Sequence, residues 1–360
     1  MACVVLPAIL PLPEAVTKRL TDLRKTMGVT GYLQTGQVTC HDPTGRLIDC
    51  AGSGHDGESR RGVPWPEPRF ELEGDIITDR LTGLIWCRNA NLAEFPLAWQ
   101  EAHDYVAQMN CSHVMGYSDW HVPNRRELRS LISHQTKRPA LPEDQRFTNI
   151  FHGWYWSSTT ASISPSHAWY VNMDGGRMFY GGKDQSFMVW PVREHGNGVL
   201  PVTGQTRCYT GTGDVIACAG TGQDGEFSHG CSWSSSRFQA SREEVIDRLT
   251  KLCWRRSADV DGPVTWVQAL AAVTRLNEQS GDSPGWRLPN INELESLVDC
   301  GMHSPALAVG HPFLEVQDVY WSSTTSLYEP DWVWALYLDK GAVGVGQKTQ
   351  ATFHVLTVRG

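Results

Sequence analysis

TGQVTCHDPTGRLIDCAGSGHDGE, at residues 35–58, recurs as TGQTRCYTGTGDVIACAGTGQDGE at residues 203–226. Further matches follow in the same order along both halves of the chain. They are DRLTGLIW (79–86) with DRLTKLCW (247–254), WHVPNRRELRSLI (120–132) with WRLPNINELESLV (286–298), and YWSSTT at both 155–160 and 320–325. Matches that keep one order over so long a span identify an internal duplication.

The duplication determines the predicted domain organisation. A chain of 360 residues is long for a single core and suits two domains of about 150–170 residues each. The Gly-containing stretch EHGNGVLPVTG (194–204) separates the two copies. We therefore predict an N-terminal extension at 1–34, a first domain at 35–198 and a second domain at 199–360.

Each copy has the residue pattern of an α+β domain. A Gly-rich hairpin and a strand come first, and apolar residues then recur at helical spacing. These residues are Trp99, Ala102, Val106 and Met109 in the first copy and Trp266, Ala269, Leu270, Val273 and Leu276 in the second. A second helix begins at PNxxEL, where Asn124 or Asn290 can cap the helix and form a capping box with the Glu three residues later. Short strands follow, so the sequence predicts two helices packed on a twisted antiparallel sheet.

The composition argues against several classes of function. A formal net charge of −8 and the lack of any Lys/Arg-rich run argue against nucleic-acid binding, which depends on clustered cations. No apolar run approaches the roughly 20 residues of a membrane helix, so no membrane insertion is expected. The first residues are interrupted by Pro7, Pro11 and Pro13 and have no basic residue before their apolar stretch. They do not form a clear secretory signal.

The motifs together resemble a known bacterial family. DxLTGLxW, WRLPNxxEL, YWSSTT, AWxVxxxxG and a terminal VR pair are similar to the C-terminal domain of the Legionella collagen-like adhesin, in two tandem copies. The resemblance implies a C-type-lectin-like fold and a protein that is extracellular or on the cell surface. The named member is implicated in adhesion to glycosaminoglycans, whereas this chain is acidic and has no collagen-like segment.

Four cysteines are placed to form disulfides within the hairpins. Cys40 and Cys50 face each other across a Gly-containing turn, and Cys208 and Cys218 repeat the arrangement. Opposed hairpin positions satisfy disulfide geometry, so we predict both bridges. Free thiols in a reducing compartment are the alternative.

The other cysteines are less constrained by the sequence. The family resemblance suggests a pair between Cys87 and Cys111, which flank the first long helix. Cys3 is expected to be unpaired. The connectivity of three further cysteines stays open, namely Cys231, Cys253 and Cys300.

No catalytic motif stands out. The SST hydroxyls at Ser157, Ser158, Ser322 and Ser323 lack the surrounding elbow of a serine nucleophile, and we expect them to bind neighbouring backbone groups. Asp119 and His121 are interpreted as loop residues, because Gly285 and Arg287 replace them in the second copy. Four histidines of the first copy, His103, His113, His121 and His134, show no metal-ligand spacing. The sequence therefore predicts no enzyme, no cofactor and no metal, and it lacks the sugar-binding motifs of calcium-dependent lectins.

The best candidate for a binding site is the strand and loop that follow each YWSSTT. Strand alternation places Trp169, Val171 and Met173 inward and their neighbours outward. Polar and aromatic side chains on a rigid sheet are typical of a recognition face, although an ordinary solvated sheet is the open alternative. The predicted ligand contacts are Tyr170, Asn172, Asp174, Arg177 and Tyr180 in the first copy, and Trp332, Tyr337, Asp339 and Lys340 in the second.

We therefore expect a non-catalytic, adhesin-like protein that binds a protein or glycan ligand at a surface. Two alternatives remain open. One is a structural subunit of an appendage, filament or phage-like particle, which would form homo-oligomers or larger assemblies. The other is a display protein diversified by a retroelement. A hydrolase or oxidase is the least favoured interpretation.

Overall fold

The computed structural model describes residues 32–234, 236–259, 261–280 and 285–360. The predicted N-terminal extension, including Cys3, lies outside the described residues except for its last three positions. The elements of the first repeat are β1 (Cys40–His41), β2 (Leu47–Ile48), α2 (Asp56–Ser59), β3 (Phe70–Glu73), β4 (Ile76–Asp79), β5 (Ile85–Cys87), β6 (Leu97–Ala98), α3 (Trp99–Cys111), η1 (Val114–Gly116), α4 (Arg125–Ser130), β7 (Trp154–Thr160), β8 (His167–Asn172), β9 (Met178–Gly182), β10 (Ser186–Phe187) and β11 (Val192–Arg193).

The second repeat follows the same order after the linker, but among the described residues it has no named counterpart of β6, η1 or β10. Its elements are β12 (Cys208–Tyr209), β13 (Val215–Ile216), α5 (Asp224–Phe227), β14 (Phe238–Ala240), β15 (Glu244–Asp247), β16 (Cys253–Arg255), α6 (Trp266–Ser280), α7 (Ile291–Ser296), β17 (Val319–Thr325), β18 (Trp332–Tyr337), β19 (Ala342–Gln347) and β20 (Val358–Arg359). The mixture of helices and antiparallel sheets confirms the predicted α+β class. Within the described residues, no helix is both long and apolar enough to cross a lipid bilayer.

The helices form where the sequence predicts them. The apolar stripe of α3 is buried at Trp99, Ala102, Val106 and Met109. Asn124 caps α4 by accepting hydrogen bonds from the backbone N–H groups of Arg126 and Glu127, and the Glu127 side chain completes the capping box. At α7, Asn290 accepts a hydrogen bond from the backbone N–H of Glu293, and the Glu293 side chain completes the capping box. These reciprocal bonds satisfy backbone groups that would otherwise be unpaired at a helix start.

One sheet joins the two repeats. Its strand order is β17-β18-β19-β9-β8-β7, so each repeat contributes three strands and the order is symmetric about the β19–β9 junction. The junction is narrow, with Val343 opposite Met178 as its one registered pair among the described residues. Each repeat also has its own four-stranded sheet, β11-β5-β4-β3 in the first and β14-β15-β16-β20 in the second. The molecule is therefore a joined pair, with a shared sheet at its centre.

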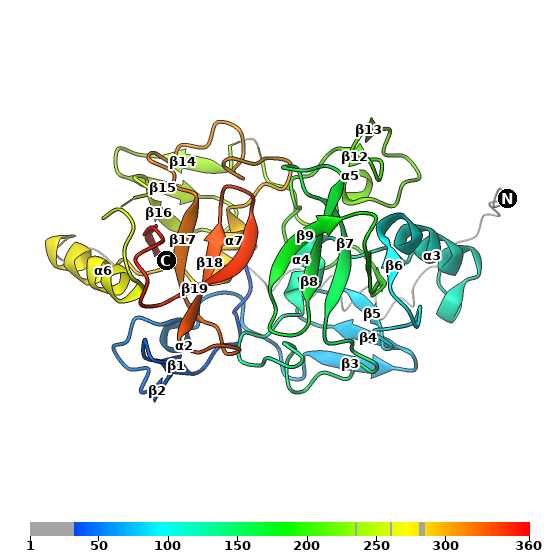
Figure 1. The fold of residues 1–360 in the computed structure, drawn as a ribbon, viewed down its shortest axis with the longest axis horizontal. Helices are drawn as coiled ribbons and strands as arrows, with labels where there is room; N and C mark the ends of the chain where they lie inside the picture. Colours follow the sequence, from blue (N-terminus) through cyan, green and yellow to red (C-terminus); the bar gives the residue numbers. More distant parts are fainter. Residues whose placement is uncertain (1–31, 235, 260, 281–284) are drawn as a thin grey trace.

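The two repeats exchange their hairpin segments. The hairpin segment of the first repeat, β1–β2–α2, packs beside β17 of the second repeat, and β12–β13–α5 packs beside β7 of the first. Figure 1 shows the first hairpin segment in blue below the orange and red strands of the second repeat. The sequence repeat divides the chain at 198/199, whereas the packing contacts cross that division in both directions.

A buried carboxyl group holds each exchanged segment in place. Asp56 lies on the first hairpin segment, and its Oδ2 accepts hydrogen bonds from the hydroxyls of Thr35 at 2.6 Å and Thr324 at 2.7 Å. Beside it, Gln37 Nε2 donates to the backbone oxygen of Thr325 at 2.8 Å, and the Thr325 N–H donates to Gln37 Oε1 at 2.9 Å. The Gln side chain thus pairs with the YWSSTT strand of the other repeat as a further strand would.

The second hairpin segment makes the same contacts on the first repeat. Asp224 Oδ2 accepts from the hydroxyls of Thr203 and Thr159, both at 2.7 Å. Gln205 pairs with the backbone of Thr160 through two bonds of 2.8 Å. We call each set of Asp, Gln and Thr side chains a latch. Because both latches join one repeat to the other, they hold the exchange from both sides.

A buried lysine adds to each latch. Lys348 of the second repeat donates to the backbone oxygen of His41 at 2.8 Å and lies beside the first hairpin segment. Lys183 of the first repeat donates to the backbone oxygen of Thr210 at 3.1 Å. Burial lowers the pKa of both lysines to about 7. Each ammonium group also lies over a Trp ring, Trp99 for Lys183 and Trp266 for Lys348, at 4.1 and 4.5 Å from the centroids.

The serines of YWSSTT have a structural role in the core. Ser157 Oγ donates to the backbone oxygen of Trp169 at 2.9 Å, and Ser322 Oγ donates to that of Trp334 at 2.7 Å. The backbone oxygens of both serines accept hydrogen bonds from the indoles of Trp99 and Trp266 at 2.8 Å. These contacts confirm that the first hydroxyl of each SST binds neighbouring backbone.

The structure confirms the two hairpin disulfides and corrects the third predicted pair. Cys40 is bonded to Cys50 and Cys208 to Cys218. Cys87 is a buried free thiol, and Cys111 is disulfide-bonded, so the pairing of Cys87 with Cys111 is wrong. Cys87 ends β5 and faces the core, where burial raises the pKa of its thiol. Three further cysteines are also free thiols in the described part of the chain, namely Cys231, Cys253 and Cys300.

The latch carboxyl groups should make stability depend on pH. Burial raises the pKa of Asp56 and Asp224 to about 6, whereas an unfolded Asp titrates near about 4. The folded state therefore binds more protons between these values, and its free energy of unfolding falls as the pH rises from about 4 to about 6. Asn does not titrate, so in the Asp56→Asn and Asp224→Asn variants we expect this decrease in the free energy of unfolding to be smaller by roughly 2–3 kcal/mol each. Urea unfolding across pH 4–7 measures the free energy of unfolding of each variant, and Glu143→Gln, a change at an exposed residue, is the control. The prediction is contradicted if the free energy of unfolding of both Asn variants changes with pH as steeply as that of the parent chain.

Removing a hairpin disulfide should weaken the exchange. The double variant Cys40→Ser, Cys50→Ser opens a short loop, and we expect it to lower the free energy of unfolding by about 2–3 kcal/mol. Denaturant unfolding in oxidising buffer measures this loss, and the difference should vanish under reducing conditions. Cys231→Ser removes a free, partly exposed thiol and serves as the control. Equal stability of the double variant and the parent chain would show that the bridge contributes nothing.

Candidate ligand-binding face

Strand β8 alternates between the core and the surface as predicted. Trp169, Val171 and Met173 are buried, whereas Tyr170 and Asn172 are partly exposed on the opposite face. Tyr170 and Asn172 therefore lie on the outer face of the shared sheet. Strand β8, which carries them, is paired with β7 on one side and with β9 on the other.

The second repeat follows the same alternation with different side chains. Trp334, Leu336 and Leu338 are buried, and Tyr337 and Asp339 are partly exposed. The hydroxyl of Tyr337 donates a hydrogen bond to the backbone oxygen of Val345 at 3.1 Å, which fixes the orientation of the ring. Burial raises the pKa of the phenol of Tyr337, as it does for Tyr170. Both phenols are therefore neutral hydrogen-bond donors at physiological pH.

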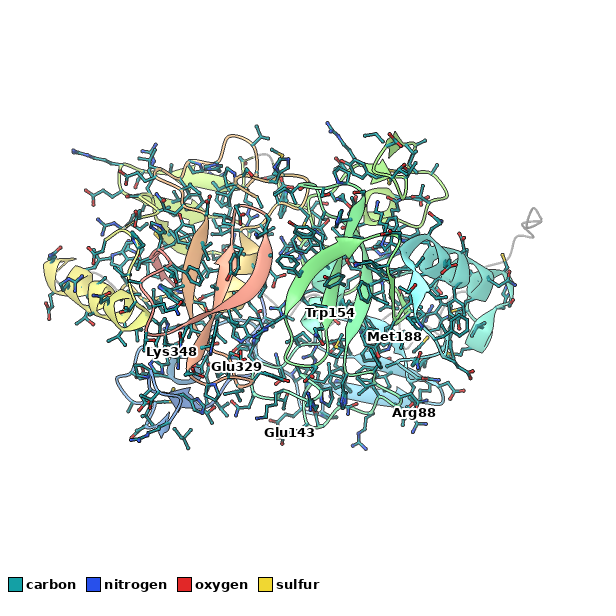
Figure 2. The ribbon with its side chains drawn as sticks, viewed as in Figure 1. Arg88, Glu143, Trp154, Met188, Glu329 and Lys348 are labelled. Carbon is teal, nitrogen blue, oxygen red and sulfur yellow. A yellow bond between two sulfur atoms is a disulfide. The ribbon has the colours of Figure 1, made fainter. Side chains whose placement is uncertain are left out.

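Aromatic rings gather around Tyr170 on the outer face. Its ring centroid lies 4.3 Å from that of Trp154 and 4.8 Å from that of Phe187. Trp154 begins β7 and pairs with Asn172, which places it on the same face. Figure 2 labels Trp154 over the strands of the first repeat. Phe179, on β9, pairs with Tyr170 and is 41% exposed.

The aromatic surface continues across the junction between the repeats. Lys340 Nζ lies 5.7 Å from the ring of Phe179 in the first repeat and 5.6 Å from the ring of Tyr337 in the second. Tyr337 in turn packs against Phe353 at 5.6 Å. We call this surface the aromatic face; its residues are Trp154, Tyr170, Phe179, Phe187, Tyr337, Lys340 and Phe353.

The charged residues predicted as ligand contacts are paired with one another or with neighbours. Asp174 binds Arg138 at 2.6 Å, and Arg177 binds Glu329 of the other repeat at 2.8 Å. Asp339 lies 3.6 Å from Lys340. In these ion pairs, the charges of Arg138, Arg177 and Lys340 are each compensated by a carboxylate.

The strand register sets two predicted contacts apart from the aromatic face. Tyr180 is registered opposite Trp169 and packs against that buried ring at 5.2 Å, and its ring also stacks on Phe179 of the aromatic face at 4.8 Å. Trp332 begins β18, two residues before the buried Trp334, and is registered opposite Gln347. In an antiparallel pair, opposed residues share a face. By register, Tyr180 therefore shares the parity of Trp169, and Trp332 shares the parity of Trp334.

Sequence reasoning missed Trp154, Phe179, Phe187 and Phe353. Trp154 directly precedes YWSSTT. Since Tyr155 is buried, strand alternation would have predicted Trp154 on the outer face. The positions of Phe179, Phe187 and Phe353 depend on how strands and segments distant in the chain pair with one another. The sequence pattern alone does not determine those contacts.

The remaining polar candidates lie elsewhere. Asp119 forms an ion pair with Arg193 at 2.8 Å, which agrees with a structural role. His103 and His134 are buried beside Trp99 and Trp334, at ring distances of 4.5 and 4.8 Å. His113 is exposed. His121 is different, because its ring faces Glu127 and, from the second repeat, His229.

The model of the Lcl C-terminal domain matches the chain twice, at residues 75–193 and 243–359. The chain belongs to this family. The two matches cover more than half of the 360 residues and confirm two tandem copies of the Lcl C-terminal domain. Comparison with curated proteins gives no match. Each matched range contains its three strands of the shared sheet and begins after the exchanged hairpin segment, so the family model covers the aromatic face and leaves out the latch Asp and Gln residues.

Proposed function

We propose that this Lcl C-terminal domain tandem is a non-catalytic, adhesin-like surface protein whose aromatic face binds a ligand. The family supports an adhesin-like surface domain. The observation that carries the proposal is the continuity of the aromatic face across β9 and β19, where Lys340 lies near one ring from each repeat. Because strands from both copies form one sheet, the pair offers one wide surface and not two separate ones.

The physical properties of the aromatic face suit recognition. Aromatic side chains supply large contact areas at low conformational cost, and a sheet holds them rigidly. Trp154 and Tyr170 are partly exposed, so a ligand can still bury surface against them. The second repeat has Val319 and Ala335 at the matching positions, so the ring cluster is concentrated on the first repeat. We place the centre of binding there.

The charges favour an uncharged glycan or a protein over a polyanion. Arg138 and Arg177 are both engaged by carboxylates, and Lys340 has Asp339 beside it. The chain also has a formal net charge of −8, which repels anionic polymers at low ionic strength. A C-type-lectin-like scaffold, which the family resemblance implies, is consistent with this role. The two hairpin disulfides favour an oxidising, extracellular location.

A binding role also fits what the serines do. Ser157 and Ser322 donate to backbone oxygens inside the core, so these hydroxyls are committed to structure. A catalytic serine needs an accessible hydroxyl and an adjacent base. We therefore propose binding without turnover.

The experiment is a screen of the purified full chain on glycan and protein arrays, with and without calcium, followed by affinity measurement of the best ligand. We expect Tyr170→Ala and Trp154→Ala each to weaken binding by at least about 30-fold, as loss of a central aromatic residue does at an interface. Leu47→Ala, an exposed apolar change on β2, should leave the affinity unchanged.

The outcomes separate the proposal from its rivals. Binding that survives both aromatic substitutions would place recognition elsewhere on the chain. Silence on every array, combined with self-assembly in solution, would favour a structural subunit. Turnover of a substrate would contradict the non-catalytic proposal directly.

A further inference from the structure

One compact group of potential metal ligands lies where the two repeats meet. Within the described residues, His121, Glu127 and His229 form the single cluster in which a ligand atom from each of three such residues lies within 4.8 Å of the others. His121 and Glu127 come from the first repeat, and His229 follows α5 on the exchanged segment of the second. The side chains of His121 and Glu127 are 4% exposed, and that of His229 is 10% exposed.

The three ligand atoms form a nearly regular triangle. His121 Nε2 lies 3.3 Å from His229 Nδ1 and 3.4 Å from Glu127 Oε1, and His229 Nδ1 lies 3.7 Å from Glu127 Oε1. Zinc binds imidazole nitrogen and carboxylate oxygen at about 2.0–2.1 Å, so adjacent ligands of a tetrahedral ion are about 3.3–3.4 Å apart. The side chains therefore present one face of a tetrahedron at close to the required spacing.

Neighbouring groups orient these ligands. Glu127 Oε2 accepts the capping bond from the Asn124 N–H at 2.8 Å and also lies 3.2 Å from His121 Nε2. The other oxygen, Oε1, lies within 3.7 Å of both imidazoles. His229 Nε2 lies 2.8 Å from His195 Nδ1, so a second imidazole fixes the ring that offers Nδ1. The backbone of His121 is bonded in both directions to Val192. Outer contacts of this kind commonly position the ligands of a metal site.

The environment of the cluster is partly apolar. The ring of Phe227 stacks on His229 at 5.0 Å and an interplanar angle of 13°, and it lies 6.0 Å from the ring of His121. A cavity of about 210 Å³ reaches His121, and its lining also includes His103, Asp104 and Glu226. A second, smaller cavity touches Glu127, His195 and His229.

The second repeat provides an internal comparison at the same positions. There Glu293 accepts two hydrogen bonds of 2.6 Å from the guanidinium of Arg287. Arg61, which follows α2 on the exchanged segment of the first repeat, matches His229 in the sequence repeat. A guanidinium neutralises its buried carboxylate directly. In the first repeat the matching carboxylate faces two imidazoles, whose nitrogen lone pairs can bind a cation. The repeats therefore differ at two matched positions: a guanidinium pairs with the carboxylate in one case, and two imidazoles lie beside it in the other.

We propose that His121, Glu127 and His229 bind one divalent transition-metal ion of the zinc class. Two imidazoles and a carboxylate are donors that zinc accepts, and three protein ligands leave the fourth position to water or to an exogenous group. Because His229 belongs to the exchanged segment, the ion would join the two repeats beside the Asp224 latch. The site is separate from the aromatic face, so its test does not depend on ligand recognition.

The test is a zinc titration of the full chain, freed of any affinity tag and of metal by a chelator. We expect one Zn²⁺ per chain with a dissociation constant below about 1 μM, and a rise in the temperature of unfolding when Zn²⁺ is present. Co²⁺ should bind competitively and give the strong visible absorption of a tetrahedral ion. Ca²⁺ and Mg²⁺ should not compete, because they prefer oxygen ligands.

Matched variants make the outcome decisive. His121→Arg copies the second repeat and preserves a partner for Glu127, and we expect it to fold and to weaken zinc binding at least 100-fold. Glu127→Gln retains the helix cap and should also weaken binding. Arg287→Lys changes the corresponding site of the second repeat and should have no effect on zinc. The proposal is overturned if the parent chain binds no zinc below about 100 μM, or if His121→Arg and Glu127→Gln bind it as tightly as the parent. In that case the cluster is a hydrogen-bonded network only.

Discussion

A buried carboxyl group that takes its hydrogen bonds from both repeats is the constraint on which the structure depends. Asp56 is fully buried, and its Oδ2 accepts one hydroxyl from its own hairpin segment and one from the other repeat. Burying a carboxylate without hydrogen bonds costs several kcal/mol. Separating the repeats would remove the Thr324 donor and the Gln37 strand-like pairing together. Since Asp224 imposes the same requirement in the opposite direction, the two repeats are best understood as one folding unit.

The exchange explains why the central sheet can be continuous with so little pairing at its middle. The β19–β9 junction has a single registered pair in the described structure, which is weak support for a six-stranded sheet. The latches and the hairpin contacts supply the attachment that the junction lacks. Arg129 of α4 adds to it, because its Nε donates to Glu295 of α7 at 3.1 Å. The aromatic face is thus positioned by contacts made away from the β19–β9 junction.

Much of the local structure could be predicted from the sequence, because it depends on neighbours in the chain. The Asn124 cap, the alternation around Trp169 and the hairpin disulfides all involve residues no more than 10 positions apart. The exchange could not be predicted, because TGQ, DGE and SSTT occur in both copies and suit either partner equally. The Cys87–Cys111 pairing failed for a related reason. Both residues flank α3 in sequence, but Cys87 turns into the core at the end of β5.

The face residues show the same limit. Tyr170 was predicted on the outer face because alternation along one strand is a local property, whereas Tyr180 required the register between β8 and β9. Phe187 comes to the sheet from the short strand β10 and Phe353 from a segment outside the named strands. Lys340 meets Phe179 only through the junction of the two repeats. Contacts between segments distant in the chain therefore determine most of the candidate site.

Divergence between the copies carries functional information that an ordinary single domain would not offer. Positions that keep the same residues in both repeats, such as Asp56 with Asp224 and Gln37 with Gln205, make the same contacts and maintain the exchange. Positions that differ lie where the structure does not require them to match. At His121 and Arg287 the backbone is the same and the glutamate is retained, so the fold accepts either solution. The choice of two imidazoles in one copy is then not a demand of packing. A binding role explains it more directly, because a guanidinium at that position already satisfies the glutamate in the other copy.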